Sequence, residues 1–175
     1  MKSHFMNLLL LLLTINLSSA WGQNHNPQIN TVCQKTRYYS ICVNALQYDP
    51  RSGNADVKTL GLIMLDSVTV KANETLHHIG VAYAKAFSPI LLRDYGNCIL
   101  SYDRAVTTDL KAVTGALKSG AYATAVNGLK NVIESDYNSC EQQFGPPPTK
   151  WEFSNETSYI LKLTLIAISI IQTLG

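Results

Sequence analysis

Hydrophobic and polar positions recur at helical spacing along most of the chain. One stripe of apolar or cysteine positions continues for about seven turns and comprises residues 91, 95, 98, 102, 106, 110, 113 and 117. A second stripe comprises residues 122, 126, 129, 133, 137, 140 and 144. Steps of three and four residues indicate one buried face of an α-helix. Alternation typical of strands is nearly absent, so the pattern predicts an all-α protein.

Glycine and proline mark where the helices begin and end. Ser88-Pro89 suits the start of the first stripe, because proline is favoured at the first helical position. Lys118-Ser119-Gly120 suits a turn between the two stripes, and Gly145 followed by Pro146-Pro147-Pro148 stops the second. The two stripes therefore predict two helices joined by a turn.

Two further helices complete the predicted bundle. The segment 55–84 is compatible with a helix, with Leu60, Ile63, Val70 and Ile79 among its apolar residues, and it follows a turn-rich stretch at 49–54. The last helix is expected at 154–174, and short helical pieces are expected around 28–47. The sequence thus predicts four long helices with a smaller helical unit before them.

The last of these helices is apolar on almost every side. Its main stripe comprises Ile160, Leu163, Ala167, Ile170 and Leu174. Such a helix is either deeply buried or in a membrane, and a lipid-anchor signal also ends in an apolar tail. Polar residues interrupt the run, at Lys162, Thr164, Ser169 and Gln172. These interruptions favour a core helix.

The first 20 residues have the pattern of a secretory signal peptide. Lys2 provides the positive start, an apolar run extends from Phe5 to Leu17, and Ser18-Ser19-Ala20 forms a small-residue cleavage site, with Ala20-Trp21-Gly22 as a second option. The apolar run is shorter than the roughly 20 residues that a membrane anchor needs. We expect residues 1–20 to be removed, leaving one domain at 21–175 and no membrane anchor in the mature form.

The spacing of the cysteines predicts how they pair. The chain has four cysteines, an even number that fits a disulfide framework in a secreted protein. Cys98 and Cys140 are equidistant from Ser119, so they face each other if two antiparallel helices turn there. Cys33 and Cys42 are close enough in sequence to close a small hairpin. Four cysteines allow three connectivities, and this geometry favours 33–42 with 98–140.

The net charge of the chain excludes several classes of partner, and two sequence motifs indicate a modified surface. The formal charge is +2, and it falls to about +1 when the leader takes Lys2 with it. We therefore expect no nucleic-acid or anionic-membrane partner, since both require a clustered basic face. Asn73-Glu74-Thr75 and Asn155-Glu156-Thr157 are candidate glycosylation sites at Asn73 and Asn155.

Residue patterns that carry catalysis are missing from the sequence. It has no Gly-x-Ser-x-Gly elbow, no phosphate-binding glycine loop and no cysteine pair at zinc spacing. Glu74 and His77 form one Glu-x-x-His, a spacing that di-iron bundles use twice with two further glutamates. His25 and His78 lack a nucleophile partner. We expect no catalytic residue, no metal, no cofactor and no enzymatic activity.

Three groups of residues around the cysteines form a specific pattern. They are Thr31-Val32-Cys33 with Thr36, Cys42, Leu46, Asp49-Pro50, Ala55-Asp56 and Leu60; Asp94-Tyr95-Gly96-Asn97-Cys98 with Tyr102 and Ala105; and Cys140-Glu141-Gln142-Gln143-Phe144. Together they resemble the signatures of the plant invertase and pectin methylesterase inhibitor family, over roughly residues 29 to 174. The resemblance implies an up-down four-helix bundle at 54–175, an N-terminal helical hairpin extension at 21–53, first-to-second and third-to-fourth disulfides, and a secreted protein of the cell wall or vacuole.

The resemblance also implies inhibition of an enzyme by occlusion of its active-site cleft. Invertase inhibitors of the family use residues near the start of the third bundle helix, typically Pro-Lys-Phe. That motif would fall near Ala123-Thr124-Ala125, and this chain lacks it. We expect the partner contact at Ser119, Gly120, Tyr122, Ala123 and Thr124. The segment Tyr122 to Ala125 is similar to invertase inhibitors known as pollen allergens.

Three functional hypotheses follow. The first is inhibition of an acid invertase (beta-fructofuranosidase), and the second is inhibition of a pectin methylesterase, towards which the missing Pro-Lys-Phe shifts weight. The third, of a different class, is a carrier or storage bundle that holds a small apolar ligand. It would need an internal cavity, whereas the regular stripes favour a filled core.

Overall fold

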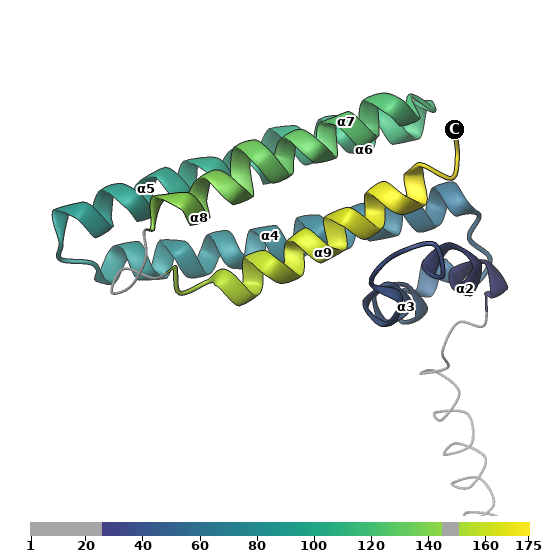
Figure 1. Cartoon of the computed structure of the whole chain (residues 1–175), viewed down its shortest axis with the longest axis horizontal. Helices are drawn as coiled ribbons and strands as arrows, with labels where there is room; N and C mark the ends of the chain where they lie inside the picture. Colours follow the sequence, from purple (N-terminus) through teal and green to yellow (C-terminus); the bar gives the residue numbers. More distant parts are fainter. Residues whose placement is uncertain (1–25, 145–150) are drawn as a thin grey trace, which may run out of the picture.

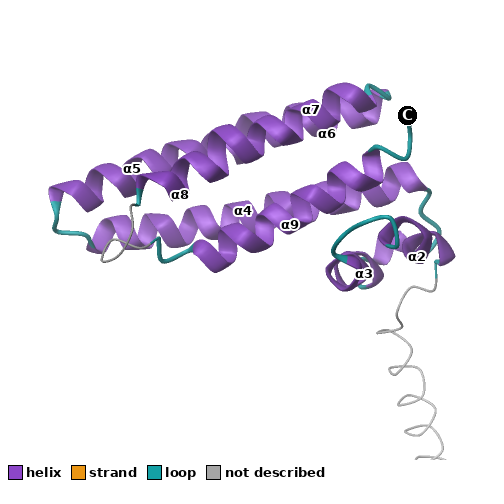
Figure 2. Cartoon of the chain, viewed as in Figure 1, coloured by secondary structure: helices purple, strands orange, loops and turns teal. Residues whose placement is uncertain are grey.

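The computed structural model describes residues 26–144 and 151–175, and this part of the chain is helical with no strand (Figure 2). The predicted leader at 1–20, His25 and the glycine–proline stop at 145–148 lie outside the described residues. The helices are α2 (Pro27–Cys33), α3 (Tyr39–Gln47), α4 (Val57–Lys85), α5 (Pro89–Arg104), α6 (Leu110–Ser119), α7 (Tyr122–Asn131), α8 (Ser139–Gln143) and α9 (Ser154–Ile171), with a 3₁₀ turn η1 (Pro50–Ser52).

Four long helical rods form the bundle, and they lie in two layers (Figure 1). One layer is a hairpin in which α5 continues into α6 and α7 continues into α8. The other consists of α4 and α9, which pack along each other. The short helices α2 and α3 lie against the end of the bundle where α4 begins and α9 ends. The predicted all-α, up-down four-helix bundle with an N-terminal helical hairpin is confirmed.

Capping residues account for several of the helix starts. The Asp56 carboxylate accepts a hydrogen bond from the backbone N–H of Thr59, 2.8 Å away, at the start of α4. Asn26 caps α2 in the same way, and its amide also donates to the carbonyls of Ser52 and Ala55, at 2.8 and 2.9 Å. This buried side chain therefore ties the N-terminal hairpin to the chain segment that leads into the bundle.

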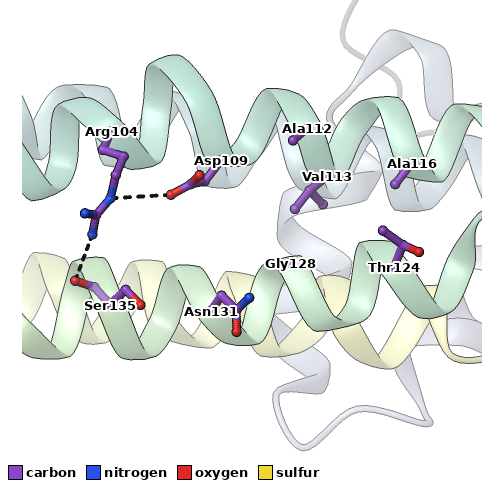
Figure 3. Close-up of a pocket in the computed structure, with 9 residues that line it drawn as sticks. All are labelled: Arg104, Asp109, Ala112, Val113, Ala116, Thr124, Gly128, Asn131 and Ser135. Carbon is purple, nitrogen blue, oxygen red and sulfur yellow. Dashed lines mark hydrogen bonds and ion pairs between the residues drawn. The ribbon is translucent and has the colours of Figure 1, made fainter.

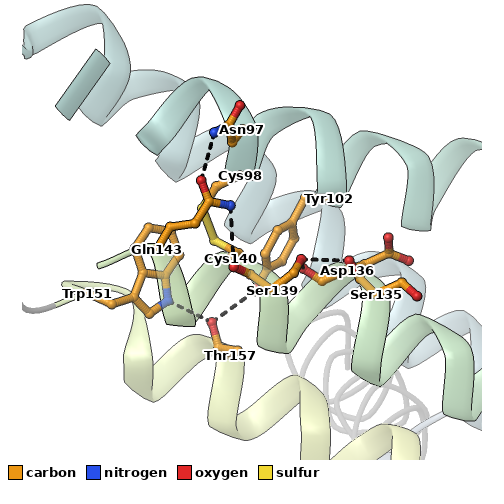
Figure 4. Close-up of a disulfide and its surroundings, with 10 residues drawn as sticks. All are labelled: Asn97, Cys98, Tyr102, Ser135, Asp136, Ser139, Cys140, Gln143, Trp151 and Thr157. Carbon is orange, nitrogen blue, oxygen red and sulfur yellow. Dashed lines mark hydrogen bonds between the residues drawn. A yellow bond between two sulfur atoms is a disulfide. The ribbon is translucent and has the colours of Figure 1, made fainter. Parts of the chain in front are cut away.

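Both expected disulfides are present, Cys33–Cys42 and Cys98–Cys140. All four cysteines are fully buried. The first bridge closes the α2–α3 hairpin, and the second joins α5 to α8 at the end of the long hairpin that is far from its turn (Figure 4). The geometric pairing of residues equidistant from Ser119 thus predicted the second bridge correctly.

Two π-helical turns interrupt the long hairpin and correct the predicted stripes. They are η2 (Ala105–Asp109), between α5 and α6, and η3 (Val132–Asn138), between α7 and α8. A π turn holds more residues than an α turn, so the buried position moves by one. Ala105 and Val132 are fully buried, whereas the predicted Val106 and Ile133 are half-buried.

The remaining sequence predictions about the core differ in their outcome. Helix α9 buries Ile160, Leu163, Ala167 and Ile170 as expected for a core helix. Of the apolar residues named in the segment 55–84, Leu60, Ile63 and Ile79 are buried, whereas Val70 is 54% exposed. Within residues 26–144 and 151–175, no helix is long and apolar enough to cross a membrane.

Candidate functional site

The residues predicted to contact a partner lie together at the turn between α6 and α7, at one end of the bundle (Figure 1). Helix α6 ends at Ser119, and Gly120 adopts the left-handed conformation with φ of 83°. The N–H of Ala121 then donates to the carbonyl of Ala116, at 2.9 Å. A left-handed residue after a helix is normally glycine, because a Cβ is strained there. Gly120 therefore allows the chain to reverse direction between α6 and α7 within two residues.

The side chains at this turn differ in exposure. Ser119, Ala123 and Thr124 are exposed, and Tyr122 is half-buried against the core. Exposed Thr124 is available to a partner, whereas Tyr122 also packs against the core. The turn is narrow, because it consists of two helix ends and a two-residue connection.

A groove of about 410 Å³ leads from Thr124 along the boundary between the two rods of the hairpin (Figure 3). Small side chains line it beside the turn, among them Ala112, Ala116 and Gly128. Gly128 is required for this close approach, because a Cβ there would lie 2.7 Å from Cγ2 of Val113 on α6. The sequence did not indicate this groove.

Charged residues close the other end of the groove. The guanidinium of Arg104 lies 3.6 Å from the Asp109 carboxylate and donates to the carbonyl of Ser135 at 3.2 Å (Figure 3). It also forms an ion pair with Asp136. Asp136 is fully buried, and burial raises the pKa of its carboxyl group while Arg104 lowers it. In the described part of the chain its Oδ2 has no hydrogen-bond partner.

Lysine side chains give the turn end a basic character. Lys58, in the first turn of α4, donates from Nζ to the carbonyl of Lys118, 2.7 Å away. Lys118 itself is exposed. Asp56 lies in the same region, with its carboxylate directed to the N–H of Thr59. Sequence reasoning missed Lys58, since nothing in the spacing brings the start of α4 to this turn.

The opposite end of the hairpin is held by a polar and aromatic network (Figure 4). Thr157 Oγ1 on α9 accepts from Trp151 Nε1 at 3.0 Å and pairs with the Tyr102 hydroxyl on α5 at 2.9 Å. Tyr95 donates to Glu152, and burial, together with that carboxylate, raises the pKa of Tyr95 to about 12. The Tyr102–Thr157 contact therefore joins the hairpin to α9, and the Cys98–Cys140 bridge joins α5 to α8, so this end of the bundle is cross-linked.

The side chains of the single Glu-x-x-His in the sequence make ordinary surface contacts. Glu74 pairs with Lys71 at 2.6 Å, and His77 is exposed. His78 lies 3.0 Å from Glu156 of α9 instead. Among residues 26–144 and 151–175 no group of three or more acidic, histidine or cysteine side chains is arranged to hold a metal ion.

Comparisons with known proteins agree on one family. The sequence model described as plant invertase/pectin methylesterase inhibitor matches residues 27–170. The chain is 34% identical to a pectinesterase inhibitor of Actinidia deliciosa, over 84% of this chain and 80% of that protein. It is 32% identical to cell wall / vacuolar inhibitor of fructosidase 2 of Arabidopsis thaliana, over 82% of this chain and 81% of that one.

A solved structure shows the same fold. The crystal structure of a mutant form of a pectin methylesterase inhibitor from Arabidopsis superposes with a TM-score of 0.71, covering 86% of this chain and 99% of that chain at 22% identity.

Proposed function

The chain belongs to the plant invertase/pectin methylesterase inhibitor family, and on that premise we propose that it is a secreted protein inhibitor that occludes the active-site cleft of an acid invertase. The inhibitory unit spans residues 21–175, with the hairpin extension at 21–53 and the bundle at 54–175. Its disulfides suit an oxidising compartment, either the cell wall or the vacuole. It acts by surface contact and not by catalysis, as the names of its relatives describe for them.

The shape and charge of the α6–α7 end carry this proposal. An α-helix with its side chains is about 10–12 Å across, so the α6–α7 end offers an enzyme cleft a contact surface that is two helices wide. Most glycoside hydrolases use two carboxyl groups in that cleft. Exposed Lys118 and its neighbour Lys58 bring positive charge to the tip. They supply a basic character where the Pro-Lys-Phe motif is absent.

A pectin methylesterase is the second candidate, and a specific observation favours it. Ala123-Thr124-Ala125 offers neither the lysine nor the aromatic ring of the invertase-inhibitor motif, and aromatic and basic anchors carry much of the energy of an interface. A partner could instead lie along the groove, where Arg104, Asp109 and Asn131 present both charge and amide groups. The two candidates therefore differ in whether the tip or the side of the hairpin dominates the contact.

A paired inhibition assay tests the proposal. The purified oxidised protein is titrated against an acid invertase and a pectin methylesterase from plant cell walls, following sucrose hydrolysis and pectin demethylation. Inhibition of the invertase supports the first candidate, and inhibition of the methylesterase alone replaces it with the second. The assay is repeated with several isoforms of each enzyme. If the protein with both disulfides formed inhibits none of them, the proposed function is contradicted.

Substitutions at the tip locate the contact. Thr124→Asp introduces a negative charge at the centre of the proposed interface, and we expect it to weaken inhibition at least tenfold. Thr108→Asp is the matched control, because Thr108 is also exposed on the hairpin but lies outside the groove. Lys118→Glu should slow association with the invertase and reduce its dependence on salt. Equal inhibition by both aspartate variants would move the contact away from the tip.

A further inference from the structure

Two asparagines in the described residues stand in the Asn-x-Ser/Thr pattern that accepts N-linked glycans. Asn73 lies in the middle of α4 and Asn155 in the first turn of α9, and both are exposed. The α5–α8 hairpin also contains asparagines, at positions 97, 127, 131 and 138, but none of them has serine or threonine two residues later. The acceptor pattern is therefore confined to one of the two layers of the bundle.

The two acceptor segments touch each other. Thr75, the third residue of the first, donates from Oγ1 to Glu156, the middle residue of the second, at 3.0 Å. Both asparagines consequently lie at the same level of the α4/α9 layer. Asn155 also borders a surface hollow of about 420 Å³ between α4 and α9, which leaves space around its side chain.

Both acceptors lie far from the α6–α7 turn along the bundle axis. Asn155 is at the start of α9, whereas the end of α9 lies next to that turn (Figure 1). The 18 residues of α9 span about 27 Å at 1.5 Å per residue. Lys58 of α4 contacts the turn, and Asn73 lies about 22 Å further along the same helix. Groups attached at either asparagine would therefore start on the α4/α9 layer, about 22 Å or more from the tip along the bundle axis.

We propose that Asn73 and Asn155 carry N-linked glycans, and that these glycans cover the α4/α9 layer while the α6–α7 end stays bare. The second half rests on the proposed function. The donor is a polyprenyl-diphosphate-linked oligosaccharide of the secretory pathway. The side-chain amide nitrogen bonds to C1 of the first sugar and loses one proton, while the C1–O bond breaks and the diphosphate leaves with its electron pair.

The folded structure also determines when this modification occurs. Thr75 and Thr157, the hydroxyl residues of the two acceptor segments, are 2% and 0% exposed and hydrogen-bonded within the bundle. A transferase that must reach these threonines cannot do so once α4 and α9 have packed. The glycans are therefore added to the chain before the bundle closes.

Mass spectrometry of the secreted protein tests the modification. The full chain with its leader is expressed in a plant secretory host, and its intact mass is measured with and without enzymatic deglycosylation. We expect two glycans, one lost in Asn73→Gln and the other in Asn155→Gln. Asn127→Gln removes an exposed asparagine outside the pattern and should keep both glycans. A secreted protein at its bare peptide mass, or a mass unchanged by either acceptor substitution, would overturn the assignment.

Inhibition assays test which face the glycans leave free. Removing the glycans should change the inhibition constant by less than twofold for whichever enzyme the paired assay identifies. A tenfold gain in affinity on deglycosylation would place the α4/α9 layer in the interface and overturn the second half of the proposal. Should neither enzyme be inhibited, the proposed function fails while the mass measurement still decides the glycans.

A glycan moved to the tip provides the converse test. The double substitution Ala121→Asn and Ala123→Thr creates an acceptor segment on the exposed turn. The secreted, glycosylated variant should lose inhibition at least tenfold, whereas the same variant made in bacteria without a glycan should keep most of it. Full inhibition by the glycosylated variant would contradict a bare tip as the enzyme contact.

Discussion

Replacing Gly128 by alanine should destabilise the bundle although alanine is the better helix former. Alanine gains about 0.5–1 kcal/mol over glycine inside a helix. The added methyl would lie 2.7 Å from Cγ2 of Val113, and a buried β-branched side chain has few alternative rotamers. Overpacking of this kind costs about 1–3 kcal/mol. We therefore expect the free energy of unfolding to fall for Gly128→Ala.

Gly115 is the matched control for this substitution. It lies exposed in α6, and a Cβ there would meet nothing within 4 Å, so Gly115→Ala should gain the full helix preference. The two variants should differ by about 1–3 kcal/mol, which corresponds to roughly 2–12 °C in Tm for a chain of this size. Urea unfolding followed by circular dichroism at 222 nm measures both values.

Relief of the clash completes the experiment. Val113→Ala opens the space that the methyl at position 128 needs, so the double variant should be more stable than the sum of the single effects predicts. If Gly128→Ala and Gly115→Ala stabilise the protein equally, the close approach of α6 and α7 does not depend on glycine. The groove beside Thr124 would then need another explanation.

Three further predictions concern the opposite end and the charged end of the groove. Replacing both cysteines of the Cys98–Cys140 bridge by alanine should lower the free energy of unfolding by about 4 kcal/mol, and replacing both cysteines of the Cys33–Cys42 bridge by about 2.5 kcal/mol. The first loss is larger because the Cys98–Cys140 bridge closes the longer loop. Equal losses in urea unfolding would contradict the loop-length argument. Thr157→Val leaves the Trp151 indole N–H and the Tyr102 hydroxyl, both buried, without their partner and should cost about 2–4 kcal/mol in unglycosylated protein, whereas Thr157→Ser should stay within about 1 kcal/mol of the native chain. Burial holds the pKa of Asp136 above its unfolded value of 3.8, so its contribution to stability is fully present below that pH and is lost as the pH rises through the folded pKa. Asp136→Asn should flatten this part of the stability curve, and a difference between variant and native protein that stays constant as the pH rises above 3.8 would contradict the raised pKa.

Regular spacing made most of the bundle predictable from the sequence. The second disulfide followed from two cysteines equidistant from Ser119, because antiparallel rods of equal length must bring such residues together. The same reasoning would have placed Arg104 opposite Glu134, because each lies the same number of residues from Ser119, whereas the structure pairs Arg104 with Asp136. Equal spacing from the turn therefore predicts the disulfide but not the partner of Arg104 in the ion pair.

Other features depend on packing that periodicity does not describe. Val106 and Ile133 continue the ideal helical stripe, yet the π turns bring Ala105 and Val132 to the core instead. The groove at Gly128 arises from the distance between two rods, which no single helix pattern contains. Lys58 reaches the tip because α4 begins beside it, and that neighbour relationship is set by the tertiary fold.

The paired π turns make the hairpin a case of two insertions that compensate each other. Each π turn amounts to an extra residue in an α-helix, and the two lie opposite each other in neighbouring rods. On the side of the π turns that is far from the α6–α7 turn, Cys98 still faces Cys140. On the side close to that turn, Val113 faces Gly128. Deleting one residue from a single rod would shift everything beyond by about 1.5 Å and 100°, and the cysteines would no longer meet. Deleting one from each would restore the register, so insertions and deletions in this hairpin are tolerated in pairs.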